Sequence, residues 1–209
     1  AGWAAYSFAW DEDGEDATLL SFGESTTLPG GQPWTYPTRG ACFRCHTAEA
    51  NFVLGVELPQ LLGTKVGEEA VEEMVARRWL TREDADWSGE VFVAPDSESP
   101  LDDRVRSYLH SNCSGCHRPD VAGVRSEMDL RYTTPFADPS TCGLEPEHGS
   151  LYGAVKNAQI IRPGVPEESV LYRRMTTLEV FRMPQLGTSV VDEQGAEIVR
   201  QWIEAMEGC

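Results

Sequence analysis

The sequence has little lysine and no long hydrophobic run, and each shortage excludes a class of protein. Lysine occurs only at Lys65 and Lys156, and 34 acidic residues against 17 basic ones leave a net charge of −17. A nucleic-acid backbone or an anionic membrane surface would repel such a chain. The longest apolar stretch, residues 52–63, is interrupted by Glu57 and Pro59, so nothing approaches the ~20 residues of a membrane span. We therefore expect neither a nucleic-acid partner nor a membrane span.

The remaining composition is that of a globular protein with one or two domains. The 209 residues are 41% hydrophobic and 24% charged, which is ordinary for a soluble fold. The acidic excess predicts first a solvated surface and second a docking face for a basic partner. No signal peptide is visible and the chain does not begin with methionine, so we expect a mature or truncated product.

Four of the six cysteines form two pairs, each followed at once by histidine. The motifs are CFRCH at 42–46, with Cys42, Cys45 and His46, and CSGCH at 113–117, with Cys113, Cys116 and His117. C-x-x-C-H is the attachment signature of c-type haem. Two thiols on one helical turn reach one porphyrin, and the next residue offers an imidazole to the iron. We therefore predict two covalent c-type haems, with a Cys₄ zinc site as the alternative.

The two remaining cysteines, Cys142 and Cys209, are the right number for one disulfide. A disulfide is the preferred prediction, and free buried thiols are the alternative. Haem attachment and a disulfide both indicate an oxidising compartment, so we expect a periplasmic or extracellular protein.

The first half of the chain predicts a β-hairpin and one helix. Residues 1–40 read as β and loop, because apolar side chains alternate up to Trp10 and ATLLSF follows a turn rich in Asp and Gly. Residues 41–98 form a first haem-binding region with a helix from Gly67 to Leu80. A short strand and linker at 88–100 mark the boundary. Counted from Val71, the other apolar positions of that helix follow at three, four and eight residues: Met74, Val75 and Trp79.

The second half, residues 99–209, predicts helices that flank the second motif. Ser99 is a good N-cap and Pro100 suits the first helical position. Leu101, Val105, Tyr108 and Leu109 then form an apolar stripe on the helix that enters CSGCH. A short helix is expected at Ser169–Met175, and a last helix begins near Asp192 with a buried stripe of Val199, Trp202, Ile203 and Met206. The fold class is mainly α with long loops.

Residues 99–209 resemble a class I cytochrome c domain. That family has an N-terminal helix, CxxCH at its end, a Met-Pro loop and a C-terminal helix that crosses the first, and all four parts occur here in this order. The resemblance implies that His117 and Met183 ligate the second iron, because methionine is a common second axial ligand. Met175 is the next candidate, and Met206 suits core packing.

A wider resemblance covers nearly the whole chain. The segments WTYPTRGACFRCHT, VRSYLHSNCSGCHRP, RMPQLGTSVVDEQG and WIEAMEGC together resemble a family of secreted diheme c-type cytochromes of poorly defined function. In that family a β-rich segment precedes the first haem motif. The N-terminal residues here resemble only the last part of it, so the chain is expected to start late relative to the family.

The sixth ligand of the first haem is predicted as His110. It lies one helical turn before Cys113, on roughly the same side of the helix as the second attachment point. Met74 is the next candidate, although its stripe also suits core packing. His148, a neighbouring chain or no ligand at all stay open.

We expect an electron carrier rather than an enzyme, acting as a relay between a redox donor and a redox acceptor. The sequence contains no Ser/His/Asp arrangement, no phosphate-cradling glycine loop and no flavin fingerprint. One alternative is an enzyme of the diheme peroxidase type, in which one haem keeps an exchangeable sixth position. The other is a structural subunit that self-associates as a cytochrome filament or belongs to a larger redox complex.

Overall fold

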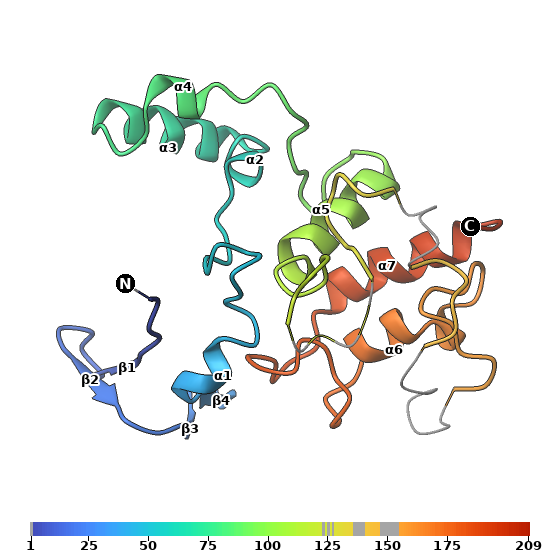
Figure 1. The fold of residues 1–209 in the computed structure, drawn as a ribbon, viewed down its shortest axis with the longest axis horizontal. Coiled ribbons are helices and arrows are strands. Elements are labelled where there is room, and N and C mark those ends of the chain that lie inside the picture. Colours follow the sequence, from blue (N-terminus) through green and yellow to red (C-terminus); the bar gives the residue numbers. More distant parts are fainter. Residues whose placement is uncertain (1, 123, 125, 127, 136–140, 147–154) are drawn as a thin grey trace.

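The fold is mixed, mostly helical with long loops. The structure is a computed structural model that describes residues 2–122, 124, 126, 128–135, 141–146 and 155–209. Within these ranges, two small N-terminal β-hairpins precede seven helices (Figure 1). The hairpins and α1 to α4 lie to one side of the view, and α5, α6 and α7 lie together on the other.

The first hairpin is confirmed and a second one was not expected. β1 (Ser7–Trp10) pairs antiparallel with β2 (Ala17–Leu20). The Asp11 carboxylate caps the intervening turn by accepting from the backbone N–H groups of residues 15 and 16. β3 (Glu24–Thr27) and β4 (Pro33–Tyr36) form the second hairpin, where a loop was predicted. The alternation of side chains in this pair is too short, and too interrupted by Pro and Gly, to signal a strand.

Four helices follow the hairpins. They are α1 (Arg39–Cys42), α2 (Leu58–Leu61), α3 (Lys65–Ala76) and α4 (Arg82–Ala85). The predicted helix exists as α3, and Val71 is buried as expected. The prediction that Trp79 belongs to its apolar stripe is wrong. The helix ends at Ala76, Arg78 has φ 61°, and Trp79 is 68% exposed.

The strand predicted within 88–100 is also wrong. These residues run as irregular backbone, and Phe92 is buried and donates its N–H to the carbonyl of Pro59 at 2.9 Å. Its apolar side chain serves as an anchor in a loop. An anchor and a strand both favour aromatic and β-branched residues, so the pattern alone did not separate them.

The C-terminal helices follow the prediction closely. α5 spans Leu101–Cys113, with Pro100 rather than Ser99 at the N-cap. α6 spans Val170–Met175 and follows a 3₁₀ turn, η1 (Pro166–Glu168). α7 spans Glu193–Ala205, and the Asp192 carboxylate caps it by accepting from the N–H of Gly195 at 3.0 Å.

The main core lies where α5 packs on α7. Val105, Leu109, Val199 and Ile203 have no measurable exposure and come from the two predicted stripes. Gly195 permits the close approach, because a Cβ at this position would lie 2.2 Å from Cζ of Tyr108. A larger residue at this position would have to displace the Tyr108 ring.

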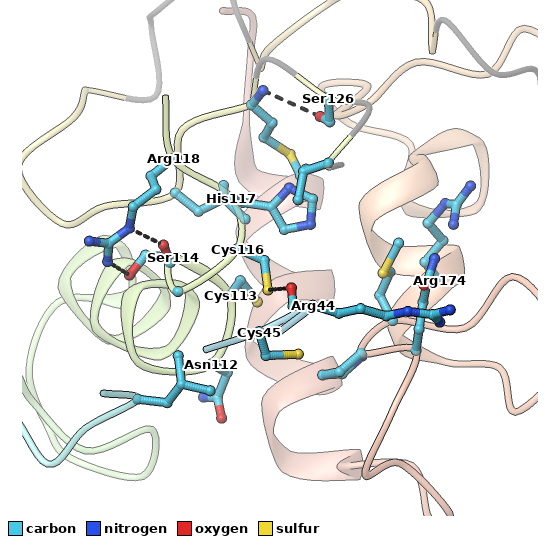
Figure 2. A pocket seen from close by; sticks show the side chains of 18 of the residues that line it. Arg44, Cys45, Asn112, Cys113, Ser114, Cys116, His117, Arg118, Ser126 and Arg174 are labelled. Atoms are coloured by element: carbon cyan, nitrogen blue, oxygen red, sulfur yellow. Dashed lines mark hydrogen bonds between the residues drawn. The ribbon is translucent and has the colours of Figure 1, made fainter. Parts of the chain in front are cut away.

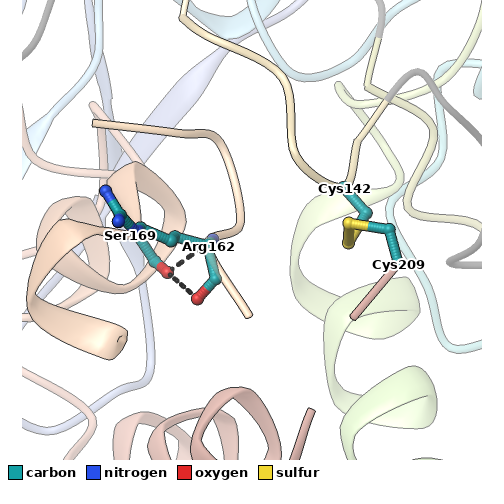
Figure 3. Close-up of a disulfide and its surroundings, with 4 residues drawn as sticks. All are labelled: Cys142, Arg162, Ser169 and Cys209. Carbon is teal, nitrogen blue, oxygen red and sulfur yellow. Dashed lines mark hydrogen bonds between the residues drawn. A yellow bond between two sulfur atoms is a disulfide. The ribbon is translucent and has the colours of Figure 1, made fainter. Parts of the chain in front are cut away.

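The disulfide between Cys142 and Cys209 is present, as predicted (Figure 3). It closes a sequence separation of 67 residues and ties the loop after the second motif to the end of the chain. On the same side of the core, the fully buried hydroxyl of Ser169 accepts from the N–H of Arg162 at 2.8 Å. Among the described residues, none of the helices is both long and apolar enough for a bilayer crossing.

Candidate functional site

A large cavity lies where the two cysteine motifs meet the C-terminal half of the chain. Its volume is about 1640 Å³, which exceeds the roughly 300–1,000 Å³ of most small-molecule sites. Cys45 of the first motif lines it, together with Cys113, Cys116 and His117 of the second (Figure 2). Met183 lines it as well. Cys42 and His46 of the first motif do not line it, and His46 is exposed. The fold therefore gathers the second motif, Cys45 and the predicted methionine loop around one space.

The rim of this cavity is apolar. Six aliphatic side chains that line it are more than 40% exposed: Val53, Leu54, Val56, Leu144, Val180 and Val190. Exposed apolar side chains that gather on a concave surface are typical of a binding site. A flat apolar cofactor such as a porphyrin would cover them.

The second motif forms one turn at the end of α5. The N–H groups of Cys116 and His117 both donate to the carbonyl of Cys113, at 3.1 and 2.8 Å. This turn presents the two sulfurs and the imidazole to the same cavity. Burial raises the pKa of Cys113 to about 12, so that thiol is neutral at pH 7.

His117 carries a ring nitrogen that lacks a partner. Its Nδ1 is buried, and no hydrogen-bond partner for it occurs in the part of the chain that the structure describes. Burial, with a smaller contribution from the positive charge of Arg174, lowers the pKa of His117 to about 4. The imidazole is therefore neutral at pH 7, which is the form that binds a metal ion. An unsatisfied neutral imidazole beside two thiols fits the donor set of a c-type haem.

The first motif has the same local geometry. The N–H groups of Cys45 and His46 donate to the carbonyl of Cys42 at 3.2 and 3.0 Å. Nδ1 of His46 lies 2.9 Å from the carbonyl oxygen of Phe52. Because a carbonyl only accepts, Nδ1 carries the proton and Nε2 keeps its lone pair. The hydrogen bond to Phe52 thus orients His46 and leaves Nε2 available to a metal ion. Histidines that ligate metals commonly donate their other ring N–H to a carbonyl or carboxylate in the same way.

Phe52 is a residue that the sequence analysis missed. Asn51 and Phe52 both have positive φ, at 52° and 60°. Trp3 stacks on the Phe52 ring at a centroid distance of 5.3 Å, and Phe43 meets it edge-on at 6.3 Å. These contacts hold the backbone whose carbonyl accepts from His46. No sequence signal points to this role, because a main-chain carbonyl acts here.

The two motifs touch each other. The neighbouring thiol of Cys116 is the main cause that lowers the pKa of Cys45 to about 6. The Cys116 thiol also donates to the carbonyl of Arg44 at 3.2 Å (Figure 2). Contact between motifs 71 residues apart could not be read from their spacing.

The zinc alternative gains no support from this arrangement. Across the described ranges, no three His, Cys, Asp or Glu side chains converge on a point that could hold a metal ion. A Cys₄ site requires four ligands placed tetrahedrally around one ion.

The methionines divide between cavity and core. Met183, Met175 and Met128 line the cavity, whereas Met206 packs against the main core as predicted. Met128, which the sequence left without a role, is buried in the core as well as lining the cavity. Met74 lies on α3, outside the lining of the cavity.

His110 lines the cavity, but both of its ring nitrogens have partners. Nδ1 accepts from the N–H of Tyr132 at 2.8 Å, and Nε2 lies 3.1 Å from Oε2 of Glu57. The Phe92 ring packs on the imidazole at a centroid distance of 4.5 Å. Ligation of the first haem by His110 therefore requires the ligating ring nitrogen to release its partner, Tyr132 or Glu57. His148 lies outside the described residues.

Comparison with known protein families, with curated proteins and with solved structures finds no match to this chain. Its function must therefore be inferred from its own residues and geometry.

Proposed function

We propose that this chain is a c-type cytochrome that carries two covalent haems and relays electrons between redox proteins outside the cytoplasm. The observation that carries the proposal is that the two CxxCH turns meet at one cavity, which Cys45 of the first motif and Cys113, Cys116 and His117 of the second line. In each motif two thiols and one imidazole occupy a single turn, and each imidazole keeps a ring nitrogen without a hydrogen-bond partner among the described residues. That donor set suits haem iron at two positions.

Each residue of the two motifs has a defined role in this proposal. Cys42 and Cys45 would attach the first haem, and His46 would ligate its iron. Cys113 and Cys116 would attach the second haem, and His117 would ligate its iron. Each iron, when bound, supplies a one-electron couple. The chain positions the two groups, excludes water with the apolar rim, and orients His46 through the carbonyl of Phe52.

The proposal includes a class I cytochrome c-like domain at 99–209, with Met183 as the second ligand of its iron. Three observations support it. α5 ends in the second motif, α7 packs across α5 through Gly195, and Met183 lines the same cavity as His117. The smaller region at 41–98 would carry the first haem. For the sixth position of that haem, His110 remains the proposal, with the rearrangement that its two hydrogen bonds require.

A location outside the cytoplasm is supported by the Cys142–Cys209 disulfide, since such bonds persist in oxidising compartments. The partners in this proposal are a redox donor and a redox acceptor. The net charge of −17 favours acceptors or donors with a basic face.

Haem staining after denaturing electrophoresis, together with intact mass, tests the proposal. The protein, expressed with a c-type haem attachment system in an oxidising compartment, is expected to carry two haems. A Cys113→Ser, Cys116→Ser variant is expected to carry one, and Cys209→Ala, the matched control outside the motifs, is expected to keep both. A colourless parent band, or a mass without haem, would reject the proposal.

A second candidate function is a diheme peroxidase, and one observation favours it. Both nitrogens of His110 have partners, and an iron without a sixth protein ligand can bind peroxide. Peroxide-dependent oxidation of a reduced donor, measured at fixed haem content, separates the two functions. An electron relay is expected to show none above the rate of free haem.

A further inference from the structure

Arg118, the residue directly after the second motif, reaches across to the first motif. Its Nε donates to the carbonyl of Ser114 and its Nη2 to the Ser114 hydroxyl at 3.2 Å (Figure 2). Its Nη1 donates to the carbonyl of Glu49 at 3.0 Å. One rigid guanidinium thus joins the turn that bears Cys113 and Cys116 to the loop that follows His46.

Two further contacts join the same pair of segments. Thr47, which is buried, donates from its hydroxyl to the carbonyl of Gly115 at 3.4 Å. Gly115 lies so close to the loop after the first motif that a Cβ there would be 2.7 Å from Cδ2 of Leu54. The two motifs therefore meet along a packed surface, with Arg118 at one end of it.

The sulfurs of the two motifs meet at this surface. The Cys116 thiol donates to the carbonyl of Arg44 at 3.2 Å, and Cys45 and Cys116 line the same cavity. Thioether bonds formed at these sulfurs would attach the two porphyrins at adjacent points of the chain. The relation between the porphyrins would then depend on the contacts that hold the motifs together.

We propose that Arg118 is a positioning residue that locks the two motifs into one fixed contact, so that the two haems behave as a coupled pair. The inference rests on the proposed function, because it requires both haems. It adds that the redox state of one haem regulates the electron affinity of the other, and that this regulation depends on a side chain that touches neither iron.

The physical consequence is electrostatic. At an effective dielectric constant of ~20, unit charges ~12 Å apart alter one another's equilibrium by about tenfold. An electron on one haem of a close pair therefore opposes the arrival of the second. Loosening the contact between the motifs weakens this effect and also removes the fixed angle between the two chromophores.

The experiment compares Arg118→Ala with Arg118→Lys and with Arg77→Ala. Arg77 is the matched control, since it is the C-cap residue of α3 and its side chain is 56% exposed and paired with Glu73. Intact mass first establishes two haems in every protein. Circular dichroism in the Soret band then reports the fixed angle between chromophores, and a redox titration reports the separation of the two reduction steps.

The parent and Arg77→Ala are expected to show the same two-signed Soret signal, in which circular dichroism has one positive and one negative lobe. They are also expected to show the same separation between the two reduction steps. Arg118→Ala is expected to lose the two-signed signal and to bring the two reduction steps closer together. Arg118→Lys is expected not to restore either, because one ammonium cannot replace a planar fork that donates to two segments. Full restoration by lysine would show that charge alone matters, and would overturn the positioning role.

An Arg118→Ala protein with two haems and an unchanged Soret signal would also overturn the inference. If Arg118→Ala fails to retain its haems, Thr47→Val decides in its place, because it removes the hydroxyl contact with Gly115, together with a local one to the N–H of Ala50, and leaves Arg118 in place. It is expected to weaken the two-signed signal, and an unchanged signal would sink the inference. A parent without two haems is a different outcome, since it rejects the proposed function itself.

Discussion

Nε2 of His110 lies 3.1 Å from Oε2 of Glu57, and this contact joins the helix that enters the second motif to the N-cap of α2. The hydrogen bond with His110 is the main cause that lowers the pKa of Glu57. On the other side of the ring, Tyr132 donates its N–H to Nδ1. The imidazole predicted to ligate the first haem is thus part of the joint between the two halves of the chain.

Replacement of His110 by alanine tests its proposed role as an iron ligand. If the imidazole ligates the first haem, His110→Ala converts that haem from low-spin to high-spin and raises its potential, because histidine ligation favours the oxidised iron more than methionine does. Electronic absorption with a redox titration provides the measurement. Glu57→Gln is the matched control, since it keeps the imidazole and removes only its charged partner. A His110→Ala spectrum equal to the parent would leave Met74 as the next candidate.

Replacement of Met183 by alanine is expected to affect the second haem only. The weak absorption that arises from a thioether bound to iron should disappear, and the potential of that haem should fall. Met175→Leu, in the same cavity, is the control and should keep the absorption. An absorption that survives in Met183→Ala and disappears in Met175→Leu would move the ligand to Met175.

Gly195→Ala is expected to destabilise the crossing of α5 and α7. The added Cβ would lie 2.2 Å from Cζ of Tyr108, and overpacking of this kind costs about 1–3 kcal/mol. The gain in helix propensity, about 1 kcal/mol at most, does not offset a clash with a ring held by Asp192. Denaturant unfolding measures the change. Gly208→Ala, where a Cβ meets nothing within 4 Å, should match the parent.

Loss of the disulfide is expected to lower stability without loss of haem. Cys142 and Cys209 close a long loop, and such a bond contributes about 2–4 kcal/mol to the free energy of unfolding. Cys209→Ala should therefore unfold at lower denaturant concentration while its haem content stays at the parent level. Alkylation of the parent provides a direct check, since Cys142 and Cys209 should react only after reduction.

Asp129 is expected to make stability depend on pH in the acid range. Burial by itself raises the pKa of this carboxylate, but hydrogen bonds from Arg131 and Thr134 outweigh it and lower the pKa. A lowered pKa in the folded state means that the stabilisation is present above pH ~4 and disappears as pH falls through the folded pKa.

Asp129→Asn should therefore be less stable than the parent by about 1.5–3 kcal/mol at pH 7, the range for hydrogen bonds with a charged group. The difference should shrink as pH falls below ~4. Unfolding measured from pH 7 to pH 3 gives both values. A difference that stays constant with pH would show that the carboxylate charge does not contribute.

The spacing of apolar residues along the sequence predicted those helices whose formation depends mainly on residues close together in the chain. The stripes around Val105 and Val199 predicted α5 and α7, because helical periodicity repeats every 3.6 residues and needs no distant information. The same reasoning failed at Trp79, where positive φ at Arg78 ends the helical path. It also failed at Phe92, whose apolar character serves a tertiary anchor rather than a strand.

By itself the sequence determined the chemistry of the two motifs, the capped helices beside them and the number of cysteines left for a disulfide. These features depend on residue type and on spacings of a few residues. Only the tertiary structure decided that Cys116 reaches the carbonyl of Arg44, that Arg118 reaches the carbonyl of Glu49, and that Glu57 and Tyr132 hydrogen-bond to the ring of His110. Each of these contacts joins segments more than 20 residues apart, often through a backbone carbonyl that every residue carries. Their existence therefore depends on how the loops pack, which no local pattern encodes.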